Sequence, residues 1–263
     1  GKRIAICEQM ETTPSSGTIV KREVVRIITP GTLIEQNLIQ GDENNFLCSA
    51  IVLDEAIGLA FVDISTGDFH LSTIRNSFEL FRGEIARFSP NEMVFRDNSK
   101  KTDARFVEFL KNSDIPAVFL NEWIYDIEYL KGIIADTFKT AGIKGFGIDS
   151  PAEILAAGSV LHYLRDTQKR ALENLKHPHR SSTAQYMVLD EATIKNLEII
   201  RNQQDGSKNR TLFSVLNKTR TAMGKRFLER TILQPLLNMN AIENRLNVVQ
   251  YFHEYHALAQ QMQ

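Results

Sequence analysis

The first half of the chain alternates short apolar runs with brief polar turns. Three β-rich runs follow one another at Phe46–Leu53, Ile57–Ile64 and Phe69–Ile74, with only short polar stretches between them. Connections this short join antiparallel neighbours. The pattern therefore predicts an antiparallel meander, preceded by two shorter strands at Ile4–Glu8 and Val24–Ile28.

After the meander the pattern changes to alternating helix and strand. Apolar residues at spacings of three and four predict a helix over Ser77–Phe88. A strand at Met93–Phe95, a helix at Thr102–Lys111 and a strand at Ile115–Leu120 follow. Such alternation favours parallel pairing with helices covering the sheet. The first half is therefore expected to be an α/β domain of RNase H-like order, a mixed sheet with flanking helices.

The second half reads as helical. One helix is predicted over Trp123–Phe138, and the glycine-rich link Gly142–Gly147 follows it. A longer apolar pattern, from Pro151 to Leu175, predicts a helix of roughly 24 residues that packs along an interhelical seam. We expect the link to act as a hinge between the α/β domain and an all-α core segment.

A further helix is predicted to begin after Asp190. This residue is a good N-cap, and Leu189 and Ile194 are spaced as a hydrophobic staple around it. The helix is expected to end near Asp205-Gly206, and a strand-like link at Tyr186–Leu189 to precede it. Shorter helices are expected at Thr211–Leu216, at Ala222–Leu233 and from Asn240 onward.

The composition indicates the class of protein and the cellular compartment. The 263 residues are 43% hydrophobic and 24% charged, as in an ordinary globular chain of one or two domains. No apolar run approaches the roughly 20 residues that cross a bilayer. Cys7 and Cys48 lie in strand-like runs, and we expect buried thiols in a cytoplasmic protein. Gly1 opens directly into an apolar run and Gln263 lies inside a helical pattern, so both ends are expected to be cuts in a longer chain.

The net charge of −1 conceals two halves of opposite sign. Acidic residues exceed basic ones before residue 150, and basic residues exceed acidic ones after it. The basic excess is concentrated between Arg201 and Arg230. Such a segment can contact nucleic acid, but solvated helical faces carry similar charge. If the segment binds nucleic acid, neutralising Lys225 and Arg226 should abolish that binding.

Asp63 is the strongest candidate for chemistry. It opens the sequence Asp-Ile-Ser-Thr-Gly at the end of a predicted strand, where two-metal nucleases of RNase H-like fold place a carboxylate. Further carboxylates would have to converge on it, and the nearby candidates are Glu92 and Asp149. The alternative is a hairpin aspartate that accepts hydrogen bonds from turn amides, and turn chemistry favours it.

Other motifs give no assembled site. The histidines form two close pairs, His177 with His179 and His253 with His256, without a third ligand at a suitable spacing, so they are interpreted as surface residues. The sequence lacks a phosphate-binding G-x-x-x-x-G-K-[ST] loop and a dinucleotide fingerprint. No catalytic, cofactor-binding or metal-binding residue is therefore assigned.

Five blocks of the sequence resemble the MutS-type DNA mismatch-repair proteins, in the order of that family. They are Ile4–Gln9, Arg22–Thr32, Gly58–Phe69, Leu189–Glu198 and Thr221–Leu228, the last continuing through Gln234-Pro-Leu236. One departure is Thr231, where many members carry tryptophan.

The resemblance implies three regions. Residues 1–22 would be the tail of the mismatch-recognition domain, 23–140 the RNase H-like connector domain, and 141–263 the beginning of the helical core. The chain would then be a non-enzymatic scaffold between mismatch recognition and the ATPase. Its partners would be the rest of the MutS chain, its dimer mate and a MutL-type protein, with mismatched DNA, ATP and Mg²⁺ bound through other domains. The rival hypothesis is a metal-dependent nuclease that uses Asp63.

Overall fold

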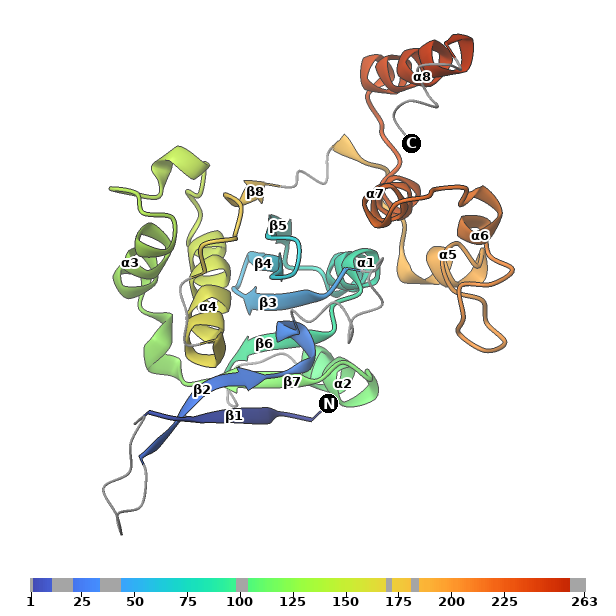
Figure 1. Cartoon of the computed structure of the whole chain (residues 1–263). Coiled ribbons are helices and arrows are strands. Elements are labelled where there is room, and N and C mark those ends of the chain that lie inside the picture. Colours follow the sequence, from blue (N-terminus) through green and yellow to red (C-terminus); the bar gives the residue numbers. More distant parts are fainter. Residues whose placement is uncertain are drawn as a thin grey trace. The chain divides into compact units, whose positions relative to one another are not determined.

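The computed structural model describes residues 2–10, 21–33, 44–97, 104–168, 172–180 and 185–255. Gly1, Thr102, His256 and Gln263, on which expectations were placed, lie outside these ranges. The chain divides into two compact units (Figure 1). The first comprises Gly1–Gln40, Asn44–Phe81 and Phe88–Ser181, and the second Gly41–Glu43, Arg82–Arg87 and Ser182–Gln263.

The first unit begins with a two-stranded antiparallel ribbon. Strands β1 (Ile4–Gln9) and β2 (Arg22–Ile28) pair from Ile4 opposite Ile28 to Gln9 opposite Arg22. Cys7 is exposed on β1, so the expectation of a buried thiol was wrong for this residue, although Cys48 is buried. A two-stranded ribbon has no second layer of its own to cover both faces, and most β1 side chains remain exposed.

A six-stranded mixed sheet forms the centre of the first unit. Its strands are β3 (Phe46–Val52), β4 (Ala56–Asp63), β5 (Asp68–Arg75), β6 (Glu92–Arg96), β7 (Ala117–Leu120) and β8 (His179–Arg180), in the order β7-β6-β3-β4-β5-β8. β3, β4 and β5 form the antiparallel meander, β6 and β7 continue parallel to β3, and β8 pairs parallel to β5. The α/β prediction is confirmed.

Helices cover both faces of this sheet (Figure 1). α1 (Phe78–Phe88) and α2 (Ala104–Asn112) lie on one side, and α3 (Ile127–Thr137) and α4 (Pro151–Gln168) lie on the other. α3 begins later than predicted, because Asp126 accepts a hydrogen bond from the Tyr129 amide at 2.8 Å and caps the helix there. A 3-10 turn, Glu122–Tyr125, precedes it.

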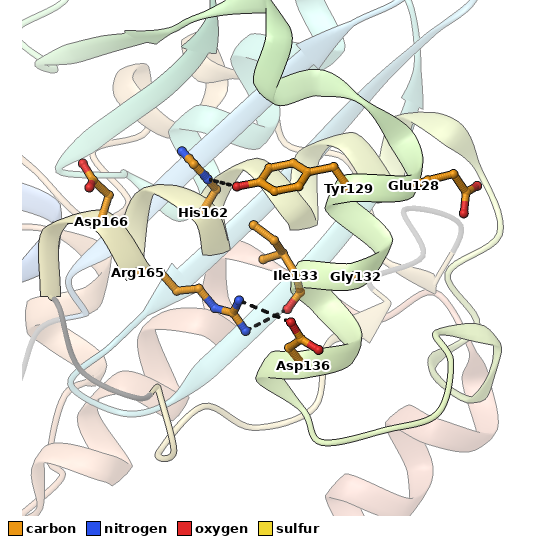
Figure 2. A pocket seen from close by; sticks show the side chains of 8 residues that line it. All are labelled: Glu128, Tyr129, Gly132, Ile133, Asp136, His162, Arg165 and Asp166. Atoms are coloured by element: carbon orange, nitrogen blue, oxygen red, sulfur yellow. Dashed lines mark hydrogen bonds and ion pairs between the residues drawn. The ribbon is translucent and has the colours of Figure 1, made fainter.

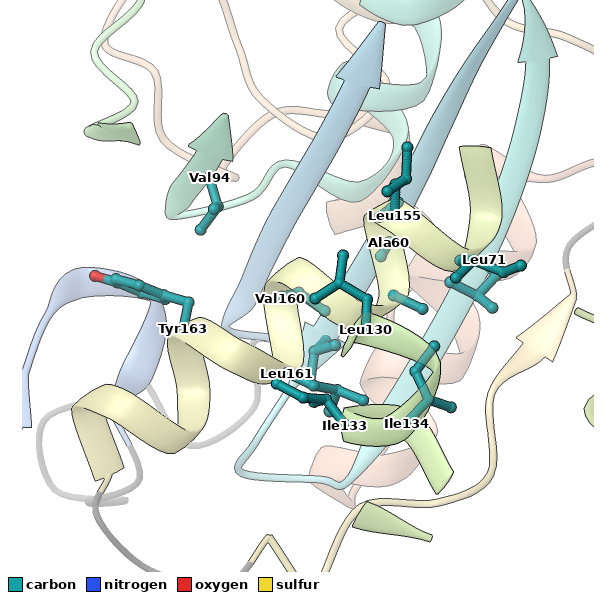
Figure 3. Close-up of a cluster of buried hydrophobic side chains, with 14 of the residues drawn as sticks. Ala60, Leu71, Val94, Leu130, Ile133, Ile134, Leu155, Val160, Leu161 and Tyr163 are labelled. Carbon is teal, nitrogen blue, oxygen red and sulfur yellow. The ribbon is translucent and has the colours of Figure 1, made fainter. Parts of the chain in front are cut away.

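α4 is shorter than the predicted helix and is buried on nearly every side. It spans 18 residues, about 27 Å. Figure 3 shows its side chains interleaved with those of α3 and of the sheet, among them Leu130, Val160 and Leu161. An interhelical seam therefore explains only part of its apolar pattern. Leu175 is also buried, but it lies in a non-helical segment that returns along the core.

The glycine-rich link is not the boundary between the two units. It joins α3 to α4, and both helices belong to the first unit. The link therefore lies inside the first unit, and rotation about it stays a prediction. The expected domain boundary at 140/141 falls between two helices that pack closely: a Cβ atom on Gly158 would lie 2.5 Å from Leu130 Cβ.

The second unit is helical, as predicted. It contains α5 (Glu191–Asn196), α6 (Leu212–Leu216), α7 (Ala222–Leu233) and α8 (Met239–Glu254), and α5 is its one clearly shortened helix among the described residues. Asp190 caps α5 by accepting from the Thr193 amide at 2.6 Å. The helix ends at Asn196 rather than near 205, since Glu198 adopts a φ of 47° and its carboxylate accepts from the Gln203 amide. The strand-like link is a single bridge between Tyr186 and Leu236.

Candidate functional site

Asp63 is buried and its carboxylate is engaged with the turn that follows it. Oδ1 accepts hydrogen bonds from the Ser65 amide at 2.9 Å and the Ser65 hydroxyl at 2.6 Å, and Oδ2 accepts from the Asn45 amide at 3.0 Å. The Gly67 amide closes the turn onto the Asp63 carbonyl at 2.8 Å. A carboxylate holding these donors orders the β4–β5 turn, as the turn interpretation predicted.

The other two candidate carboxylates do not gather with Asp63 into a metal site. Glu92 is also buried, but its oxygens face Thr29, Gly31 and Tyr163, while Asp149 is exposed. Within the ranges that the structure describes, no three His, Cys, Asp or Glu residues are grouped to hold a metal ion.

The described members of the two histidine pairs lie on the surface. His177 is exposed and its ring stacks on Phe146, with ring centroids 5.1 Å apart. His179 is exposed in β8, opposite His70 of β5, and His253 is exposed on α8. The prediction of surface histidines is confirmed for these three.

The basic segment makes several local contacts. Lys208 pairs with Glu229 at 2.9 Å. The guanidinium groups of Arg230 and Arg245 both lie 5.8 Å from the centre of the Phe227 ring, within the range of cation–π attraction. Lys208 and Arg230 of the segment are therefore engaged with residues of α7, while Arg245, which lies outside the segment, joins α8 to the same ring.

A surface pocket between α3 and α4 was not predicted (Figure 2). Its volume is about 530 Å³. The lining residues come from one face of each helix: Glu128, Tyr129, Gly132, Ile133 and Asp136 from α3, and His162, Arg165 and Asp166 from α4. The spacing of three and four within each helix was visible in the sequence. The pairing of the two helices was not.

Hydrogen bonds fix the walls of this α3–α4 pocket. The Tyr129 hydroxyl lies 3.1 Å from His162 Nδ1, and Arg165 donates to the Ile133 carbonyl at 3.2 Å and lies 3.8 Å from Asp136 (Figure 2). Burial lowers the pKa of His162, and Arg165 adds to this effect against the opposing charge of Asp166. The imidazole is therefore kept neutral at pH 7 and can accept a hydrogen bond from Tyr129.

Trp123 extends the pocket rim into an aromatic surface. The residue is 66% exposed, and its ring lies 6.1 Å from the Tyr129 ring and 6.2 Å from the His162 ring. Gly132 leaves the centre of the pocket open, because a Cβ atom there would meet no atom of the described residues within 4 Å. Exposed aromatic rings around a concave surface are typical of protein interaction sites.

A strand ribbon, a mixed α/β unit and a helical unit, in this order, are the architecture of a multidomain chain. Family models match in the same order: MutS domain I at residues 1–37, MutS domain II at 45–178 and MutS domain III at 192–263. The chain belongs to the MutS family of DNA mismatch repair proteins.

Individual relatives agree over the full chain. The DNA mismatch repair protein MutS of Halothermothrix orenii is 37% identical over 264 residues, and that of Alkaliphilus metalliredigens 38% over 266. The MutS of Protochlamydia amoebophila is 33% identical over 265 residues. All three alignments cover 100% of this chain but only 29%, 30% and 31% of the relative. The chain thus spans less than a third of the relatives it matches.

Proposed function

We propose that this chain is the scaffold segment of a MutS-type mismatch-repair protein, joining mismatch recognition to the rest of the molecule without chemistry of its own. This proposal rests on Asp63, because both oxygens of its carboxylate accept hydrogen bonds from the amides of Asn45 and Ser65 and from the Ser65 hydroxyl. A nuclease carboxylate needs free oxygens toward a metal and neighbours that share it. The nuclease alternative is therefore not favoured.

We place the α/β unit in the RNase H-like class. The strand order β5-β4-β3-β6-β7, with an antiparallel meander followed by two parallel strands, supports this proposal. Such a sheet with helices on both faces makes a rigid connector, because each layer is buried against the next.

The exposed apolar face of α8 indicates contact with further protein. α8 carries apolar side chains that are largely exposed, among them Leu246 and Val249 at 60% and 62%. Exposed apolar faces of this kind favour coverage by further protein, either the rest of the MutS chain or its dimer mate.

This sequence lacks a phosphate-binding loop, so we assign the ATP, the Mg²⁺ and the main contacts with mismatched DNA to other domains. No helix in the described ranges is long and apolar enough to cross a membrane, and we expect the protein in the cytoplasm.

The α3–α4 pocket is our candidate docking surface for a MutL-type protein. Its aromatic rim and open centre support this assignment. Gly132→Arg should fill the pocket without disturbing the fold and should weaken binding of a MutL-type protein at least tenfold, measured by biolayer interferometry. Gly145→Arg is the matched control, since Gly145 also faces open space in the same unit. Equal affinities for both variants would remove the pocket from consideration.

A nuclease assay separates the scaffold from its rival. The 263-residue chain is incubated with labelled duplex DNA and Mg²⁺, alongside Asp63→Asn. We expect no cleavage by either protein. Mg²⁺-dependent cleavage by the unmodified chain that disappears in Asp63→Asn would establish the nuclease instead.

A further inference from the structure

A buried glutamate meets the turn that leads out of the β1–β2 ribbon. Glu92 lies on β6 and is 1% exposed. Its Oε2 accepts hydrogen bonds from the Thr29 hydroxyl at 2.5 Å and from the Gly31 amide at 3.0 Å, and its Oε1 accepts from the Tyr163 hydroxyl at 2.7 Å. Three donors from two other segments therefore converge on one carboxylate.

The turn is shaped to fit this carboxylate. Residues Pro30–Thr32 form a 3-10 turn, and the Thr32 hydroxyl accepts from the Thr29 amide at 2.9 Å. A Cβ atom on Gly31 would lie 2.8 Å from Glu92 Cβ, so a side chain at this position would displace the turn from β6. The close approach brings the Gly31 amide into hydrogen-bonding range.

Tyr163 of α4 extends the contact to the residue that precedes the first strand. Arg3, just before β1, donates from Nη2 to the Tyr163 hydroxyl at 3.2 Å. Burial, and then the negative charge of Glu92, raise the pKa of Tyr163 to about 12. The hydroxyl is therefore protonated at neutral pH and can donate to Glu92 while accepting from Arg3.

From this geometry we infer that Glu92 is the positioning residue that fixes the β1–β2 ribbon to the six-stranded sheet and α4 of the first unit, so that ribbon and sheet move as one body. The residues that match MutS domain I end at 37 and those that match domain II begin at 45, so the contact lies at the junction of the two domains. The functional meaning of the Glu92 contact rests on the proposed scaffold role. If the mismatch-recognition domain moves, the connector domain would move with it, because the junction between them is rigid.

Glu153 provides a control for a general effect on stability. It is fully buried on α4 in the same unit, it accepts from the Thr73 hydroxyl at 3.0 Å, and it pairs with Arg180 of β8 at 3.0 Å. Replacing Glu153 removes a comparable buried carboxylate. Glu153 contacts β8 at one edge of the sheet, whereas Glu92 lies on β6, next to the strand at the other edge.

Hydrogen exchange of the 263-residue chain tests the inference locally. In Glu92→Gln the amides of residues 22–33 should exchange roughly tenfold faster or more, while those of β4 and β5 keep their rates. Thr29→Val, which removes one donor at nearly constant volume, should act in the same direction to a smaller extent. Glu153→Gln should leave residues 22–33 unchanged. Unchanged exchange at 22–33 in Glu92→Gln, or equal acceleration throughout the unit in both glutamate variants, would overturn the inference.

A distance measurement tests the single-body behaviour directly. Cys7 is exposed and Cys48 is buried, so a spin label attaches to the ribbon at Cys7, and Lys131→Cys provides a second site on α3. The distance distribution between the labels should broaden in Glu92→Gln and remain narrow in Glu153→Gln. These readouts require neither DNA nor a MutL-type protein, so they can fail while the scaffold proposal stands, and the reverse.

Discussion

The Gly67 carbonyl oxygen accepts a hydrogen bond from the Lys176 amide at 2.8 Å, and this contact joins the β4–β5 turn to the segment that follows α4. The Lys176 ammonium reinforces it by pairing with Asp68 at 2.6 Å. The turn therefore has a second role beyond reversing the chain: it is the surface on which residues 174–176 are held.

Gly67→Ala should be strongly destabilising. Gly67 has a φ of 75°, and a Cβ atom there would lie 2.2 Å from the Asn174 carbonyl oxygen. Strained backbone and the loss of the Lys176 contact together should lower the free energy of unfolding by roughly 2 kcal/mol or more, measured by urea denaturation. Gly145→Ala is the control, since a Cβ atom on Gly145 would meet no atom within 4 Å in the part of the chain that the structure describes. Similar stability of the two variants would contradict the assigned role of the turn.

Two glycines of the α3–α4 pair should respond in opposite directions. Gly158→Ala forces a Cβ atom against Leu130 and should cost roughly 1–3 kcal/mol by overpacking. Gly132→Ala meets open space on α3 and should stabilise by about 0.5–1 kcal/mol through helix propensity. Thermal unfolding followed by circular dichroism measures both. A loss of stability in Gly132→Ala would show that the pocket is tighter than its geometry indicates.

Asp63→Asn tests the turn role by stability rather than activity. An amide offers one acceptor oxygen where the carboxylate offers two, so part of the set of donors from Asn45 and Ser65 is left unpaired in a buried position. We expect a loss of roughly 1–3 kcal/mol by urea denaturation. Asp149→Asn, at an exposed position, should change stability by less than about 0.5 kcal/mol.

His162 should titrate below its ordinary pKa. Burial disfavours the imidazolium, and Arg165 repels it, so the folded pKa is lower than the reference value of 6.5. As the pH falls, the unfolded chain therefore binds a proton at His162 before the folded protein does, which favours unfolding. The neutral His162 thus contributes its full share of the folding free energy above about pH 6.5, and this share is lost as the pH falls toward the folded pKa. NMR titration of the imidazole resonances checks the direction. A folded pKa at or above 6.5 would contradict the described environment.

Much of the fold could be predicted because its signals are local. The meander from Phe46 to Ile74 and the cap at Asp190 follow from turn chemistry and period, which depend on neighbouring residues. The end of α4 could not be predicted, since Leu172 and Leu175 keep a helical spacing while packing from a non-helical segment. The spacing of apolar residues indicates which side chains are buried, but it does not show whether their backbone is helical.

The candidate sites divide in the same way. Asp63 stood out because its donors, Ser65 and Thr66, follow it directly in the sequence. The partners of Glu92 and the walls of the α3–α4 pocket come from residues far apart in the chain, and Glu92 meets Tyr163 across 71 positions. A single sequence carries no signal of such pairings.

The link between α3 and α4 has a practical consequence. A Cβ atom added at Gly142, Gly145 or Gly147 would meet no atom of the described residues within 4 Å, while Ile143 and Ile148, which alternate with these glycines in the sequence, bury their side chains in the hydrophobic core. Such an exposed stretch, fastened by its apolar neighbours, should accept an inserted epitope or fluorophore-binding peptide without unfolding the domain. The protein therefore offers an internal tagging position that leaves the ribbon, the α3–α4 pocket and α8 untouched.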